Sequence, residues 1–138
     1  GSGAFVNDRR LRVSGRRQMA ESLFATGIPF LGHGSDATHA QFTKELSAIM
    51  AVSAGVRRFG SAALDLAYVA AGRYDGFWEH GLSSWDIAAG ILLVREAGGF
   101  VSDFSSRDRA LQTGDVVAGN PAIHAALLKH LATARSGS

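Results

Sequence analysis

The chain has 138 residues, of which 46% are hydrophobic and 19% are charged, and it contains no cysteine. This composition excludes a disulfide framework and a thiolate metal site, and no apolar run reaches the roughly 18 residues that a membrane span requires. The formal net charge of +2 is too small to indicate nucleic-acid binding. From the length we expect one globular domain over residues 1–138, and from the lack of cysteine a reducing cytoplasm. Residues 1–3 and 136–138, Gly-Ser-Gly and Ser-Gly-Ser, resemble either vector remnants or linkers, and we assign them no function.

The N-terminal part of the chain predicts a hairpin followed by a buried strand. In residues 4–14 apolar and charged side chains alternate around Asn7-Asp8, which favours a β-hairpin with solvated arginines over a polybasic arm. Residues 22–30 form an apolar run that Gly27 and Pro29 end, as is typical of a buried strand.

The next stretch predicts a loop, a helix, a strand and a second helix. Residues 32–39 are polar, and either Ser35 or Asp36 is placed to cap the helix that follows. Residues 56–60 predict a short strand, and residues 61–72 predict a helix rich in small side chains. Helical spacing predicts one buried stripe on the first of these helices, made of Phe42, Leu46, Ile49, Met50 and Ser53.

The last part of the chain continues the alternation of strands and helices. Residues 75–79, 100–104 and 115–119 predict strands, and residues 85–97 predict a helix. A final amphipathic helix starts at Asn120-Pro121. Alternating elements of this kind predict the α/β class, with a layered mixed sheet flanked by helices.

Asp86 is a carboxylate at the entrance of an otherwise apolar helix. One interpretation is structural: Ser83 stands three residues before it, as in a capping box, and an acidic first turn favours the helix dipole. The other interpretation is a functional site. Residues 60–62, Gly-Ser-Ala, place a glycine turn at a helix start, and Glu79 ends a strand seven residues before Asp86. Carboxylates beside a helix N-terminus suit Mg²⁺ and a phosphate-bearing substrate, so these residues indicate a site but not a reaction.

Longer motifs resemble a known family. The most specific is Trp85-Asp86-Ile87-Ala88-Ala89-Gly90 leading to Glu96-Ala97-Gly98-Gly99, and the segment Ala71-Gly72-Arg73-Tyr74-Asp75-Gly76 matches as well. Residues 56–104 as a whole closely resemble the C-terminal half of inositol monophosphatases, and residues 3–14 resemble the hairpin in the middle of these enzymes. The resemblance extends from about residue 3 to residue 131.

The resemblance implies a Mg²⁺-dependent phosphomonoesterase that acts on inositol monophosphates or related sugar phosphates. Asp86 then matches a metal ligand of the family, and Glu79 matches the residue that binds substrate hydroxyls. The turn that holds the substrate ring matches Gly60, Ser61 and Ala62. The neighbouring Trp85 is expected to pack rather than to contact substrate.

The chain also departs from the family pattern. It lacks the metal-binding Glu and the Asp-Pro-x-Asp-Gly-Thr segment of the family's N-terminal half. Two-metal hydrolysis needs several converging oxygen ligands, so we expect little or no activity from this chain alone. We expect it to work with a missing N-terminal half, and to form homo-oligomers that cover the apolar face left open. The alternative is a non-catalytic α/β module for binding or assembly, in which the site residues are inherited.

Five further side chains carry expectations. His80 directly follows the candidate site residue Glu79 and is expected either to contact substrate or to be solvated. Asp65 is expected to form a hydrogen bond or salt bridge that fixes helix packing, and Asp103 is expected to make a turn. At most one of Arg57 and Arg58 is expected to face inward, because neighbours on a strand alternate sides.

Overall fold

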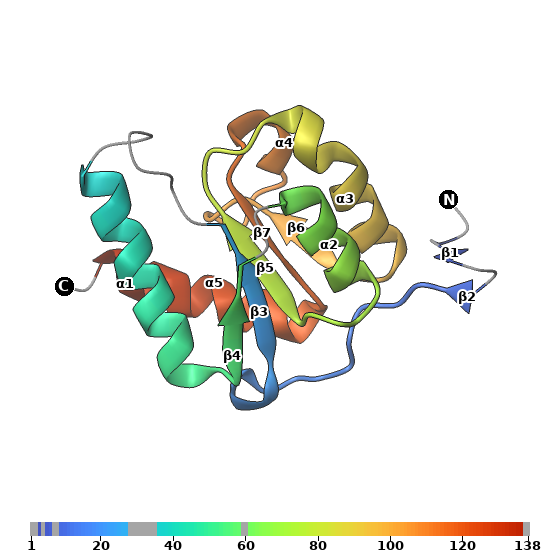
Figure 1. Ribbon diagram of the computed structural model, residues 1–138, viewed down its shortest axis with the longest axis horizontal. Helices are drawn as coiled ribbons and strands as arrows, with labels where there is room; N and C mark the ends of the chain where they lie inside the picture. The colour runs from blue at the N-terminus through green and yellow to red at the C-terminus, as the bar shows by residue number, and fades with distance from the viewer. Residues whose placement is uncertain (1–2, 4, 7–8, 28–35, 59–60, 137–138) are drawn as a thin grey trace.

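A five-stranded mixed sheet forms the centre of the fold (Figure 1). The computed structural model describes residues 3, 5–6, 9–27, 36–58 and 61–136, with the side chains of Phe5, Val6, Arg9, Asp36 and Asp86 outside that description. The strands are β3 (Leu23–Thr26), β4 (Gly55–Arg57), β5 (Gly76–Glu79), β6 (Phe100–Ser102) and β7 (Val116–Gly119). Their order across the sheet is β4-β3-β5-β7-β6.

The strand directions bring several chain ends to one side of the sheet. β3 pairs in parallel with both β4 and β5, whereas β7 runs antiparallel to β5 and to β6. The carboxyl ends of β3, β4 and β5, at Thr26, Arg57 and Glu79, therefore lie together. We call this side the carboxyl end of the sheet.

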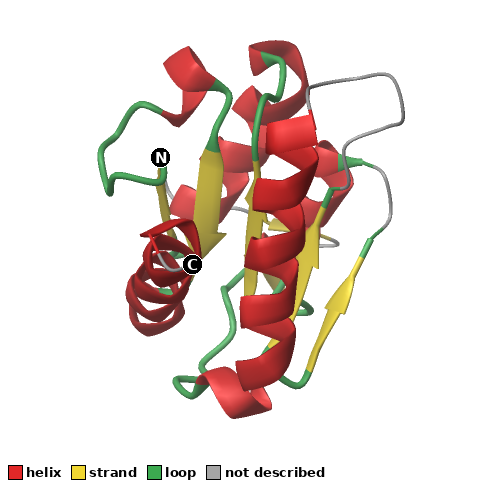
Figure 2. Ribbon diagram, turned by 90° about the vertical axis from the view of Figure 1, so that its left-hand side faces the viewer, coloured by secondary structure: helices red, strands yellow, loops and turns green. Residues whose placement is uncertain are grey.

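Helices cover both faces of the sheet. α1 (Asp36–Val52) and α5 (Pro121–Ser136) lie on one face, and α2 (Ala62–Ala70) and α3 (Ser84–Glu96) lie on the other (Figures 1 and 2). Because α1, α2 and α3 each follow a parallel strand, all three begin at the carboxyl end of the sheet. Two short helices, η1 (Met19–Glu21) and α4 (Ala110–Thr113), precede β3 and β7. Among the described residues, no helix combines the length and the apolar composition needed to cross a membrane.

Two hydrophobic cores fill the spaces between the layers. Phe77 belongs to the core beneath α2 and α3, whereas Trp78 belongs to the core beneath α1 and α5. Alternation along β5 explains this division, since successive side chains of a strand point to opposite faces. The next two side chains follow the same rule, so Glu79 points toward the layer of α2 and α3, and His80 points toward α1.

The mixed sheet with helices on both faces confirms the predicted α/β class and the order of its main elements. The predicted hairpin is present but short, with β1 (Phe5–Val6) and β2 (Arg9–Arg10) paired antiparallel. The predicted loop over residues 32–39 is too long, because α1 already begins at Asp36. The sequence patterns also missed η1 and α4. Residues expected to make turns or caps at Asn7, Asp8, Pro29, Ser35 and Gly60 lie outside the described residues.

The buried stripe of α1 differs from the predicted one. Phe42 and Ile49 are buried as predicted, but the side chain of Met50 is 58% exposed and Ser53 lies beyond the helix. Glu45 occupies the inward position between Phe42 and Ile49 and is completely buried. Helical spacing places these three residues on one side of α1. The predicted stripe consists of apolar residues, apart from Ser53, and therefore leaves out Glu45.

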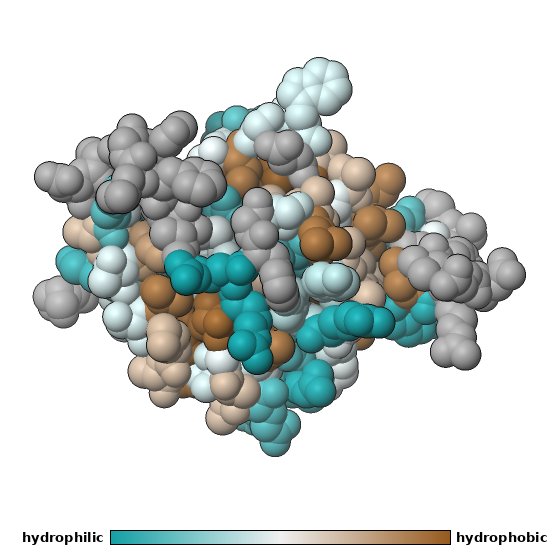
Figure 3. All heavy atoms as spheres, viewed as in Figure 1, coloured by the Kyte–Doolittle hydropathy of each residue, from teal (hydrophilic) through white to brown (hydrophobic). Residues whose placement is uncertain are grey.

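The outer surface of α2 and α3 is partly apolar. Leu64 on α2 is 44% exposed, and Trp85 and Leu92 on α3 are 94% and 60% exposed. Figure 3 shows hydrophobic surface over these two helices. We call Leu64, Trp85 and Leu92 the open face of α2 and α3. Exposed apolar side chains of this kind are typical of surfaces that contact another protein or another layer of the same protein.

Candidate functional site

Two predicted site segments meet at the carboxyl end of the sheet. Glu79 is the last residue of β5, and the chain that leaves β4 reaches Ser61, the N-cap of α2. β3 lies between β4 and β5, and two inter-strand spacings of about 4.8 Å put the two strand ends about 10 Å apart. Glu79 and α2 also lie on the same face of the sheet. One small ligand can therefore contact both.

Gly27 is a residue of this site that sequence patterns did not find. In the parallel register Thr26 of β3 lies beside Trp78 of β5, so Gly27, the next residue along, lies beside Glu79. The Glu79 carboxylate rests against the Gly27 backbone, where an alanine Cβ would overlap Oε1. Sequence patterns indicated only a strand end at Gly27, because local hydrophobicity does not show which residues two parallel strands bring together.

α3 follows Glu79 after a short loop and carries the second predicted carboxylate. Ser83 is its N-cap, and the Ser83 hydroxyl accepts a hydrogen bond from the Trp85 N–H at 3.3 Å. The predicted cap is therefore confirmed, and Asp86 lies in the first turn of α3. The side chain of Trp85 is 94% exposed, so the prediction that it packs is wrong for this chain.

The start of α2 offers backbone donors to a ligand. The Ser61 hydroxyl accepts a hydrogen bond from the Leu64 N–H at 3.2 Å, and Ala62, the first residue of the helix, is buried. The first N–H groups of a helix have no partner within it, and the positive ends of the dipoles of α2 and α3 both lie at the carboxyl end of the sheet. These groups suit an anionic or hydroxyl-bearing ligand.

The described residues do not form a complete metal site. Over the described side chains, which do not include those of Asp36, Asp86 and residues 7–8, 28–35 and 59–60, no three or more His, Asp or Glu residues come close enough to hold an ion. A Mg²⁺ ion takes about six oxygen ligands. Of the two predicted site carboxylates, Glu79 and Asp86, the structure describes the side chain of Glu79 alone. A complete Mg²⁺ site would need further oxygen ligands besides these two carboxylates.

Asp65 contradicts its prediction. Its side chain, in the first turn of α2, is 1% exposed, yet neither carboxylate oxygen has a hydrogen-bond partner within the described part of the chain. Burial raises the pKa of Asp65 from its ordinary 3.8 to about 6. Burial of the Tyr74 hydroxyl, followed by the charge of Asp65, raises the pKa of Tyr74. Asp65 is thus a buried group whose charged form is unfavourable, rather than half of a packing salt bridge.

The other predictions for single residues have mixed outcomes. Asp103 makes the predicted turn, since its carboxylate accepts hydrogen bonds from two backbone N–H groups of that turn at 2.9 and 2.8 Å. Arg57 and Arg58 are both exposed, so neither faces the interior. His80 is not simply solvated, because its Nε2 lies 2.8 Å from Oε2 of Glu45 on the face of the sheet opposite the predicted site.

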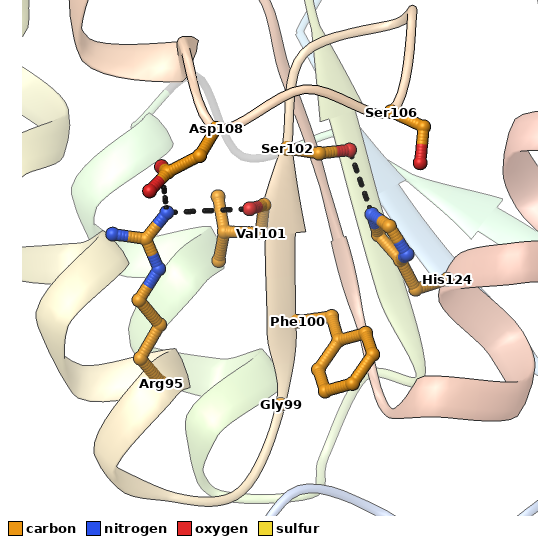
Figure 4. Close-up of a pocket in the computed structure, with 8 residues that line it drawn as sticks. All are labelled: Arg95, Gly99, Phe100, Val101, Ser102, Ser106, Asp108 and His124. Carbon is orange, nitrogen blue, oxygen red and sulfur yellow. Dashed lines mark hydrogen bonds and ion pairs between the residues drawn. The ribbon is translucent and has the colours of Figure 1, made fainter.

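A separate pocket of about 410 Å³ opens beside the edge strand β6, and its lining includes none of the predicted site residues (Figure 4). Ser102 Oγ and His124 Nε2 meet there at 2.7 Å, but the Ser102 hydroxyl also donates to the Asp103 carbonyl at 2.8 Å. Burial lowers the pKa of His124, so its ring is neutral at pH 7. Because the hydroxyl has one proton, His124 is the donor toward Ser102 and does not activate it as a nucleophile.

Arg95 covers the outer side of β6 in the same pocket. Its guanidinium donates to the Val101 carbonyl at 3.3 Å and lies 2.5 Å from a carboxylate oxygen of Asp108. Figure 4 shows the Val101 carbonyl pointing toward Arg95. A backbone acceptor of the edge strand is therefore already hydrogen-bonded.

Known proteins match this chain along almost its whole length. The model of the inositol monophosphatase family matches residues 1–136. An inositol-1-monophosphatase of Mesorhizobium japonicum is 61% identical over 129 residues, which are 94% of this chain and 47% of that protein. The Nus factor SuhB of Pseudomonas aeruginosa is 52% identical over 128 residues, which are 93% of this chain and 47% of that protein. The chain spans about half the length of these curated relatives.

Solved structures share the fold. The extragenic suppressor protein suhB of Bartonella henselae has a TM-score of 0.91 and 51% identity, over 100% of this chain and 51% of its own. The inositol monophosphatase of Anabaena has a TM-score of 0.86 and 40% identity, over 96% of this chain and 54% of its own. In both proteins the matching part is about half of the solved chain.

Proposed function

Because the chain belongs to the inositol monophosphatase family, we propose that it supplies the substrate side of a Mg²⁺-dependent phosphomonoesterase that hydrolyses inositol monophosphate or a related sugar phosphate. The observation that carries this proposal is the Glu79 carboxylate held over Gly27, on the same face of the sheet as the start of α2. In this arrangement Glu79 accepts hydrogen bonds from substrate hydroxyls. The turn of Gly60, Ser61 and Ala62 holds the ring.

We further propose that Asp86 is one ligand of a metal site that this chain does not complete. Hydrolysis of a phosphomonoester breaks the bond between phosphorus and the sugar oxygen and transfers the phosphoryl group to water, so charge develops on both sides of phosphorus. One carboxylate from this chain cannot stabilise both sides. The remaining ligands come from an N-terminal half, and this chain alone is expected to have little or no activity.

The test is release of phosphate from inositol 1-phosphate. The chain is assayed alone and with the N-terminal half of the Mesorhizobium japonicum relative added in trans, with and without Mg²⁺; we call this mixture the complemented protein. We expect no turnover from the chain alone and Mg²⁺-dependent turnover from the complemented protein. Asp86→Asn should lower kcat/KM of the complemented protein at least about 100-fold, because a neutral amide replaces a charged metal ligand.

Glu21→Gln is the matched control for Asp86→Asn. Glu21 is an exposed carboxylate in η1, before the amino end of β3 and far from the carboxyl end of the sheet. Its replacement should leave kcat/KM within about twofold. Turnover that survives Asp86→Asn would remove Asp86 from the metal site. Turnover by the chain alone would contradict the proposal that the site is incomplete.

A second candidate is a non-catalytic module for binding or assembly. Relatives from Pseudomonas aeruginosa and Salmonella typhimurium, 52% and 50% identical to this chain, are named Nus factor SuhB, a name that describes a factor rather than an enzyme. The lack of a three-ligand cluster among the described side chains is compatible with such a role. The same assay separates the candidates, because Mg²⁺-dependent turnover that Asp86→Asn removes would exclude a purely non-catalytic role.

We also propose an occupant for the open face of α2 and α3. The curated relatives are about twice as long as this chain. In this proposal their additional half packs against Leu64, Trp85 and Leu92, which are exposed on α2 and α3. When this chain is alone, a second copy covers the same residues, because large exposed apolar side chains favour association.

Size-exclusion chromatography with light scattering tests the proposed dimer. We expect the wild-type chain to be dimeric and Leu92→Glu to be monomeric, because the introduced charge would have to lose its water in the interface. Met50→Glu is the control, since Met50 is similarly exposed, at 58%, but lies on α1 on the other side of the sheet. A wild-type monomer, or a dimer that survives Leu92→Glu, would refute the proposal.

A further inference from the structure

Glu45 and His80 form a pair on the face of the sheet opposite Glu79. Glu45, on α1, is completely buried. Its Oε2 and Oε1 lie 2.8 and 3.1 Å from Nε2 of His80, and Gln41 Nε2 donates to Oε2 at 3.3 Å. A carboxylate removed from water needs hydrogen-bond donors to offset its lost hydration. Among the described side chains, His80 supplies the closest donor to Glu45.

The ring of His80 is also fixed by stacking. It lies on the ring of Phe104, with centroids 3.9 Å apart and an angle of 14° between the planes. The guanidinium of Arg135 lies 5.7 Å from the centre of the Phe104 ring. His80 Nδ1 is 3.7 Å from Oδ1 of Asp115, which is too long for a hydrogen bond. The bond to Glu45 and the stacking contact thus set the orientation of the ring.

The backbone that follows His80 is anchored as well. The Gly81 N–H donates to Oδ1 of Asp115 at 3.0 Å, and the Leu82 N–H donates to the Gly114 carbonyl at 2.8 Å. Gly81 has φ of 70°, which lets the chain turn directly after His80. Three consecutive residues between β5 and α3 are therefore held in place, the first by its side chain and the next two by their N–H groups.

We propose that His80 is a positioning residue: its bond to Glu45 fixes the loop that joins Glu79 to Asp86, and so sets where these two residues lie. His80 follows Glu79 directly but points to the other face, so a change in the position of its ring moves the backbone that carries Glu79. A misplacement of about 1 Å at a site can cost about 100-fold in rate. The effect on substrate rests on the proposed function, whereas the effect on the loop does not.

Two amide variants of His80 test this role. His80→Gln carries its amide about as far from the backbone as Nε2 and can still donate to Glu45, whereas the shorter side chain of His80→Asn does not reach. NMR of the isotopically labelled chain reads the Glu79 carboxyl carbon and the backbone amides of residues 82–86. We expect His80→Asn to shift these signals, and His80→Gln to leave them close to wild type. His130→Asn, a histidine replacement on α5, is the control.

The kinetic readout uses the complemented protein. His80→Asn is expected to raise KM for inositol 1-phosphate about tenfold with a smaller change in kcat, and His80→Gln to change KM less than about threefold. Wild-type signals for Glu79 and residues 82–86 in folded His80→Asn would overturn the proposal, as would equal damage by both variants. If His80→Asn does not fold, Glu45→Met removes the acceptor while filling its volume, and the same signals are read. If the complemented protein has no turnover, the proposed function fails, and NMR alone decides the role of His80.

Discussion

Replacing Gly27 with alanine should lower kcat/KM of the complemented protein for inositol 1-phosphate at least about 100-fold, with little loss of stability. The added Cβ would overlap Oε1 of Glu79, so the carboxylate has to leave the position it holds over the strand end. That carboxylate is the far end of a flexible side chain, so it can move aside without a shift of the backbone. Alanine also restricts the unfolded chain more than glycine does. We therefore expect the free energy of unfolding, measured in urea, to change by less than about 1 kcal/mol.

Gly15→Ala is the matched control for this substitution. A Cβ at residue 15 meets no heavy atom within 4 Å, and the backbone there is not left-handed. Its activity and the NMR signal of the Glu79 carboxyl carbon should match those of the wild type, whereas that signal should move in Gly27→Ala. Full activity of Gly27→Ala would mean that substrate binding does not need the present position of Glu79.

Asp65→Asn should raise the free energy of unfolding at pH 7.5 by about 1–2 kcal/mol. A pKa shift of about two units corresponds to roughly 3 kcal/mol, and we expect less because the surroundings of the charge relax. The native Asp65 side chain is 1% exposed and has no hydrogen-bond partner among the described residues, so its negative charge is unfavourable in the folded state. Asparagine has the same shape and no charge. Urea unfolding at pH 7.5 measures the gain.

The sign of the pH dependence follows from the pKa of Asp65. It is about 6 in the folded chain and near the ordinary 3.8 in the unfolded chain, so the folded state holds the proton more tightly. The contribution of Asp65 to the free energy of unfolding is highest below about pH 4, where its carboxyl is protonated. This contribution falls as the pH rises to about 6 and stays low above that value. Asp65→Asn should therefore equal the wild type at pH 4 and exceed it at pH 7.5.

A surface carboxylate provides the comparison for Asp65. The side chain of Asp108 is 82% exposed and pairs with Arg95, so Asp108→Asn should change the free energy of unfolding by less than about 0.5 kcal/mol at either pH. If Asp65→Asn were as neutral as Asp108→Asn at pH 7.5, or if it lowered stability there, the carboxylate would have a partner that offsets its charge.

The arrangement of elements could be predicted from the sequence because strands and helices alternate and their apolar patterns are strong. Once a strand is known to precede a helix, the last strand residue and the first helix residues fall at the same end of a parallel sheet. This rule alone brings Glu79 and Ser61 to the carboxyl end. The spacing between Ser83 and Asp86 separately identified Ser83 as the cap of α3. The family motifs then supplied the chemistry that spacing could not.

The roles of three residues could not be predicted in this way, because those roles depend on neighbours far along the chain. Gly27 is important because the pairing of β3 with β5 puts it beside Glu79. Thr26 pairs with Trp78, 52 positions later in the sequence, and the same separation joins Gly27 to Glu79. Glu45 occupies a position that apolar patterning reserves for a hydrophobic side chain, and its partner is on a distant strand end. Asp65 was expected to have a partner because buried carboxylates usually do, and the packing of α2 supplies none among the described residues.

The bond between Arg95 and the Val101 carbonyl bears on how copies of this chain can aggregate. Ordered fibrils grow when an incoming strand hydrogen-bonds to a free sheet edge, and a charged side chain on that edge is a common protection against such growth. At one edge of this sheet Arg95 occupies one backbone acceptor of β6, and at the other edge β4 is three residues long and ends in an exposed arginine. Neither edge offers a long, flat template, so overproduced chain should form amorphous or discrete assemblies through its helices rather than cross-β polymers.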